Sequence, residues 1–135
     1  MSSRPRRGPT LFLDRNLGGH IVADLLREAE IPFQRHDDVL PSDAPDEDWI
    51  ELCAQHDWIA VTRDKRIRYR HAEIEAIVAS RAAVVVIRSK TATGQSMGAL
   101  LVAAYPRITR FAADHARPFI VGLDGSGRLR PYELT

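Results

Sequence analysis

The 135-residue sequence has almost no cysteine, no long apolar run and little net charge, and each shortage excludes a class of protein. Cys53 is the only cysteine, so an intrachain disulfide is excluded and a reducing cytoplasm is the expected compartment. No apolar stretch approaches the ~20 residues that a membrane-spanning helix needs, so no membrane partner is expected. The formal net charge is only +1, so any charged binding surface must come from a local patch.

Internal repeats and low-complexity linkers are also missing. A hydrophobic fraction of 44% and a charged fraction of 27% are ordinary for a globular protein. We therefore expect one folded domain over residues 10–135. Residues 1–9 are basic and lack the apolar core of a secretory signal, which indicates a disordered basic arm.

The apolar residues alternate between short runs and helical spacing, which is typical of an α/β layer structure. Strands are expected at 10–14, 31–35, 58–62 and 82–87, with helices between them. The helix starting near Asp46 should bury Trp49, Ile50, Cys53 and Ala54. A later helical stretch contains Pro106, which should kink or split it. The last segment predicts a β-hairpin around residues 124–127.

Two aspartates directly follow predicted strands, and a third begins a helix on the same side of the sheet. Asp14 ends the first strand, Asp64 follows the strand at 58–62, and Asp46 starts the helix before that strand. In an open parallel sheet, ligands bind beyond the carboxyl ends of the strands. Three carboxylates that meet there would repel one another unless a hard divalent cation such as Mg²⁺ or Mn²⁺ neutralised them.

Positive charge is concentrated beside Asp64, although the net charge of the whole chain is small. Residues 63–70 carry five cations, whereas residues 37–48 carry six acids and no base. Such cations suit phosphate contacts beside a metal. The candidates to contact the phosphates of a nucleic acid are Arg15, Lys65, Arg66, Arg68 and Arg70.

Plainer interpretations of these residues stay open. Asp14 is also typical of a turn, Asp46 of a helix start, and Asp64 of a cap or a salt bridge with Arg66 or Arg68. Cys53 and His56 have the spacing of half a zinc site, but core packing of Cys53 is favoured. Thr91, Thr93 and Ser96 suit either a phosphate site or a helix cap.

The segments LFLDRNLGGHIVADLL and PDEDWIELCAQHDWIAVTRDKRIR resemble the PIN-like domains, the fold of the VapC-type toxin ribonucleases. The family motifs match Asp14 with Asn16, Asp46 with Glu47, and Thr62 with Asp64. Where a further acid commonly follows the Thr-x-Asp motif, this chain has Lys65, Arg66 and Ile67. The resemblance implies a three-layer sandwich with a central, mainly parallel sheet flanked by helices, and often a cognate antitoxin protein. Homodimers are common in this superfamily.

The leading hypothesis is a metal-dependent endoribonuclease, the toxin of a toxin–antitoxin pair. Asp14, Asp46 and Asp64 would hold Mg²⁺ or Mn²⁺ with Glu47 as a fourth acid, and a water activated by the ion would hydrolyse RNA. Asn16 and Thr62 join the substrate-binding set through the family motifs. The alternative is a non-catalytic PIN-like module that binds RNA or protein. A receiver-type phosphoacceptor domain, with Lys90 as its lysine, is less favoured because FLDRN lacks an adjacent acidic pair.

Overall fold

The computed structural model describes residues 8–17, 19–89 and 93–134, and these form a six-stranded sheet in the order β2-β1-β3-β4-β5-β6. The first five strands are parallel, and β6 pairs antiparallel with β5. The strands are β1 (Leu11–Leu13), β2 (Phe33–Arg35), β3 (Ile59–Thr62), β4 (Ala83–Ile87), β5 (Phe119–Leu123) and β6 (Leu129–Tyr132). The predicted mainly parallel sheet and C-terminal hairpin are confirmed.

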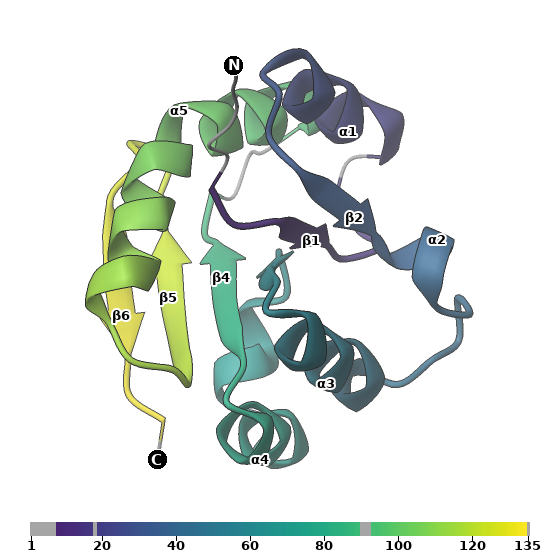
Figure 1. The fold of residues 1–135 in the computed structure, drawn as a ribbon, viewed down its shortest axis with the longest axis vertical. Helices are drawn as coiled ribbons and strands as arrows, with labels where there is room; N and C mark the ends of the chain where they lie inside the picture. Colours follow the sequence, from purple (N-terminus) through teal and green to yellow (C-terminus); the bar gives the residue numbers. More distant parts are fainter. Residues whose placement is uncertain (1–7, 18, 90–92, 135) are drawn as a thin grey trace, which may run out of the picture.

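Helices cover both faces of this sheet and make three layers (Figure 1). The helices are α1 (Gly19–Glu28), α2 (His36–Val39), α3 (Asp46–His56), α4 (His71–Ser80) and α5 (Gly94–Asp114). One apolar cluster joins α1 and α5 to alternate strand residues such as Leu11, Ile59 and Val85. A second cluster joins α3 and α4 to the residues between them, such as Phe12 and Val84.

The central strands are buried at every position because both of their faces are covered, and apart from Thr62 and Gly122 their residues are apolar. All residues of β1, β3, β4 and β5 are buried, as expected for strands of a parallel sheet between two helix layers. The edge strand β2 is only partly buried. Removing all of this apolar surface from water is the main favourable contribution to folding, at about 25 cal/mol per Å².

The buried faces of some helices are narrower than the spacing of their apolar residues suggests. Trp49, Ile50 and Cys53 form the buried face of α3, as predicted, and Ala54 is partly buried. In contrast, Ile21 of α1 is 47% exposed and Val78 of α4 is 44% exposed. Each of these two residues lies at the margin of its helical face.

Helix α5 begins with a capping box, in which Thr93 and Ser96 each bond the backbone N–H of the other. The helix-cap interpretation of these residues is therefore the observed one.

Pro106 lies inside α5 without splitting it, and Figure 1 shows that the helix changes direction along its length. Thr91 and Lys90 lie outside the described residues, as do residues 1–7 of the predicted arm. The carbonyl of Pro9 accepts a hydrogen bond from the Tyr105 hydroxyl at 2.6 Å.

Two short elements occur where only loop was expected. Helix α2 lies in the acidic segment, and a 3-10 helix, η1 (Lys65–Arg68), lies in the cationic segment. Ile67, the apolar residue of η1, is fully buried and anchors that turn in the cluster beneath α3 and α4. Among the described residues, no helix combines the length and the hydropathy of a membrane span.

Candidate active site

A pocket with a cavity volume of about 630 Å³ opens at the carboxyl ends of the parallel strands. The chain runs from β1 to β2 on one side and reaches β3 and β4 on the other, so the direction of strand order reverses beside β1. Ligand sites of α/β proteins occur at such a reversal. The pocket is lined by Asp14, Arg15, Asn16, Asp46, Arg63, Asp64, Lys65, Arg66, Arg70, Ile87 and Ser89.

Asp14 directly follows β1 and is fixed through both carboxylate oxygens. Its Oδ1 accepts the backbone N–H of Arg15 at 2.8 Å, and its Oδ2 accepts the Thr62 hydroxyl at 2.8 Å. Burial nevertheless raises the pKa of Asp14 above its ordinary value, and the negative charge of Asp46 adds to that rise. The two hydrogen bonds and the charge of His36 act in the opposite direction. Desolvation is the largest of these effects.

Thr62 links the ends of β1 and β3. Its side chain is fully buried, and its hydroxyl donates to Asp14 and accepts the backbone N–H of Asp64 at 3.1 Å. A hydroxyl can do both at once, because it carries one proton and two lone pairs. Thr62 therefore sets the spacing between two of the predicted site acids.

Asp64 caps the short helix η1, because its Oδ1 accepts the backbone N–H of Arg66 at 3.1 Å. Its Oδ2 accepts a hydrogen bond from Nη1 of Arg70 at 2.8 Å, and Nε of Arg66 lies 3.6 Å from its Oδ1. The cap and the ion pair with Arg66 agree with the plain interpretation of Asp64, whereas its shorter ion pair, with Arg70, was not predicted.

Asp46 is the first residue of α3, but it does not cap that helix. The cap position belongs to Pro45, and Oδ1 of Asp46 instead accepts the indole N–H of Trp49 at 3.0 Å. Trp49 is 1% exposed and stacks on Phe12, with 6.1 Å between ring centroids. The orientation of Asp46 is therefore held by the core beneath it.

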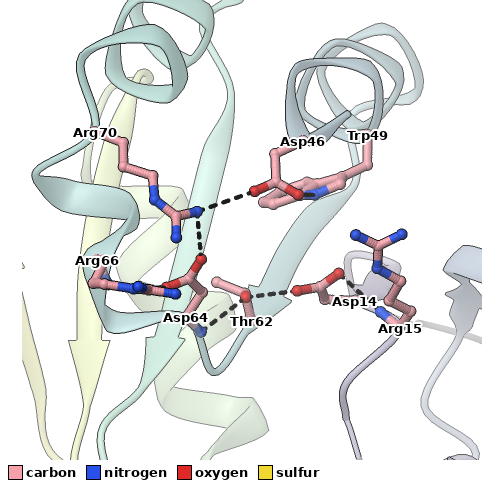
Figure 2. A network of polar contacts seen from close by, with 8 residues as sticks. All are labelled: Asp14, Arg15, Asp46, Trp49, Thr62, Asp64, Arg66 and Arg70. Carbon is pink, nitrogen blue, oxygen red and sulfur yellow. Dashed lines mark hydrogen bonds and ion pairs between the residues drawn. The ribbon is translucent and has the colours of Figure 1, made fainter. Parts of the chain in front are cut away.

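Arg70 bridges two of the three acids from its position just before α4. Its Nη1 lies 2.8 Å from Oδ2 of Asp64 and 3.6 Å from Oδ2 of Asp46. Figure 2 shows the guanidinium between these carboxylates, with Thr62 and Asp14 continuing the network beyond Asp64. All three side chains are partly exposed, at 35% for Arg70, 25% for Asp64 and 22% for Asp46.

The remaining predicted residues divide between the pocket and its surroundings. Arg15, Asn16, Lys65 and Arg66 line the pocket, whereas Glu47 and Arg68 are not among the lining residues. The Arg68 guanidinium instead lies over the rings of Tyr69 and Tyr132, 4.5 and 4.2 Å from their centroids.

Arg63 and Ser89 also line the pocket, although neither is among the predicted site residues. Arg63 belongs to the same run of cations as Lys65 and Arg66. Ser89 closely follows β4, so the rule that ligands bind beyond strand ends would have found it.

The donor chemistry of the pocket fits a hard divalent cation, and in this structure its three acids contact other groups of the protein. Carboxylate oxygens suit Mg²⁺ and Mn²⁺, and the guanidinium of Arg70 shows that positive charge is drawn between Asp46 and Asp64. However, within the part of the chain that the structure describes, no three His, Cys, Asp or Glu side chains are grouped to bind one ion. Arg70 forms ion pairs with two of the acids, and Thr62 donates a hydrogen bond to the third.

In a comparison with known families, the family model described as a PIN like domain matches residues 9–89. That range includes every residue that lines the pocket. No curated protein and no solved structure matches the chain significantly.

Proposed function

The chain belongs to the PIN-like domain family, and from that premise we propose that it is a Mg²⁺- or Mn²⁺-dependent endoribonuclease. The observation that supports the proposal most strongly is the common pocket of Asp14, Asp46 and Asp64, which come from three remote segments of the chain. We propose these three as the metal-binding and catalytic residues, with Glu47 as an outer acid. A bound divalent ion would orient a water and stabilise charge that develops on the phosphate.

The roles of the other residues follow from their contacts. Thr62 and Trp49 hold Asp14 and Asp46 in place through the hydrogen bonds described above. The pocket-lining cations Arg15, Lys65 and Arg66 are exposed and can bind the sugar-phosphate backbone of RNA. Asn16, at the mouth of the same pocket, adds an uncharged donor and acceptor.

The proposal is tested by Mn²⁺-dependent cleavage of single-stranded RNA. Asp14→Asn and Asp64→Asn should each lower the cleavage rate by about 100-fold or more, the usual effect of removing one charge-stabilising group from an active site. Asp48→Asn is the matched control, because Asp48 lies two residues after Asp46 in α3, is exposed and does not line the pocket. Full activity in both pocket variants would exclude the mechanism.

A second candidate is a non-catalytic PIN-like module that binds RNA or protein. The ion pairs of Arg70 with Asp46 and Asp64 favour it, since they satisfy two acids without a metal. The two candidates differ in thermal unfolding. An ion that binds only the folded state raises the midpoint by mass action, so Mn²⁺ should raise the midpoint of a nuclease and leave that of a metal-free module unchanged.

The toxin assignment is a finer proposal within the same function. It includes a cognate antitoxin protein as partner, a homodimer that brings the cationic residues 63–70 of two copies together, and a place in the cytoplasm. A neighbouring reading frame for a small DNA-binding protein that copurifies with this chain would support it.

A further inference from the structure

The guanidinium of Arg70 lies between the carboxylates of Asp46 and Asp64, so it would compete with any cation that binds both of them. A single nitrogen, Nη1, faces the Oδ2 atom of each carboxylate. Asp14 lies beyond Thr62 in the same network and has no ion pair with Arg70 among the described contacts (Figure 2). The guanidinium is therefore a built-in counter-cation for two of three clustered acids.

The charge on Arg70 is permanent, but its hold on the carboxylates is weak. A guanidinium does not lose its proton in proteins, so Arg70 stays positively charged whenever the two carboxylates are ionised. Ion pairs between partly exposed side chains contribute little to stability, because water screens them and the side chains lose freedom. A divalent cation offers twice the charge to the same oxygens. Unlike Arg70, it has no side chain of its own that must be ordered, so it competes well with Arg70 for the two carboxylates.

We propose that Arg70 and a divalent cation exchange on Asp46 and Asp64. In the metal-free protein, Arg70 holds the two acids together. When the ion binds them, Arg70 leaves and its guanidinium becomes a phosphate ligand for RNA in the same pocket. This inference rests on the proposed function, and it adds that metal binding and RNA binding favour each other.

The first test is Mn²⁺ binding by isothermal titration calorimetry, without RNA. Arg70→Gln removes the competitor and should tighten Mn²⁺ binding by about fivefold or more, the lower end of typical coupling between sites. Arg70→Lys keeps the charge and should stay close to the wild type. Arg110→Gln is the matched control, because Arg110 is an exposed cation on α5 that does not line the pocket, so it should change the affinity by less than twofold.

The second test measures the linkage with RNA that cannot be cleaved, such as a 2′-O-methyl oligonucleotide. Wild-type protein should bind this RNA more tightly when Mn²⁺ is present, and the gain should shrink in Arg70→Gln. Binding free energies are reciprocal, so the same factor should appear when Mn²⁺ is titrated into the RNA complex.

Two outcomes separate this inference from the proposed function. If Arg70→Gln binds Mn²⁺ no more tightly than the wild type while Asp14→Asn loses binding, the exchange is overturned and the metal site stands. If neither the wild type nor Arg70→Gln binds Mn²⁺ at millimolar concentration, the metal-dependent function fails, and the exchange fails with it.

Discussion

At the scale of single residues, the pocket contains one acid, Asp14, whose charged form is destabilised because the fold partly removes it from water. Asp14 lies between the buried end of β1 and Thr62, and burial raises the pKa of its carboxyl. In the unfolded chain the pKa of this carboxyl is near its ordinary value of 3.8. At pH values between this pKa and the raised pKa of the folded state, the folded protein therefore binds more protons than the unfolded chain. The free energy of unfolding therefore falls as pH rises through this interval and stays lower above it.

Asp14→Asn should consequently increase stability at neutral pH, although it removes a proposed catalytic group. The gain over the wild type should disappear as the pH falls below the ordinary pKa of an aspartate, where Asp14 is protonated in both states. Urea unfolding at several pH values measures this difference. Asp43→Asn, in the exposed loop before α3, removes the same charge without burial and should show no such trend. An Asn variant less stable than the wild type at every pH would contradict the argument.

Sequence reasoning placed the acids in one pocket, but it could not foresee their partners. Asp14 and Asp64 were found because they follow strands, and parallel strands end at one edge. The bridge made by Arg70 depends on which rotamer its long side chain adopts and on where η1 ends. The contact of Arg68 with Tyr132 joins segments that are distant in sequence. A cationic run alone gives no reason to expect these different roles.

At the scale of elements, the strands and longer helices were predictable because each has a clear apolar period or a continuous apolar run. The short helix α2 and the turn η1 were not, since neither is long enough to show a period. Tertiary contacts hold them instead: Ile67 buries η1, and Asp64 caps it. These contacts depend on the assembled sheet.

The packing of α1 on α5 relies on Gly98. A Cβ atom at this position would lie 2.5 Å from Cδ1 and 3.2 Å from Cβ of Leu25. Gly98→Ala should gain up to about 1 kcal/mol in helix propensity, but overpacking typically costs about 1–3 kcal/mol. The tip of Leu25 can rotate away, whereas its Cβ moves only with α1, so we expect a net loss in the free energy of unfolding, measured with urea.

The double variant with Leu25→Ala tests whether Leu25 causes that loss. With only a small side chain opposite, the Gly98→Ala change should become neutral or stabilising. Equal losses in both backgrounds would show that the loss has another origin. Such a double-mutant cycle is suitable because the two residues are in contact.

At the scale of the whole molecule, a chain of nearly zero net charge presents a locally positive pocket. Five cations and three acids line it, and the five outnumber the acids even while Arg70 is paired. Binding of single-stranded RNA should therefore weaken with salt. Lys65→Ala should reduce the steepness of log affinity against log salt by about 0.7, as expected for one lost phosphate contact.

Arg110→Ala is the matched control for this measurement. Arg110 is an exposed cation on α5 and does not line the pocket, so the variant has the same net charge as Lys65→Ala but leaves the pocket unchanged. Equal salt slopes for the two variants would show that RNA binds elsewhere or responds only to total charge.

The family match ends at residue 89, and the last residue that lines the pocket is Ser89. Helix α5 and the hairpin of β5 and β6 follow that point and contribute buried apolar surface to the sheet. Because no lining residue follows Ser89, the described residues of this final third can influence the pocket only from a distance, through the sheet on which they pack.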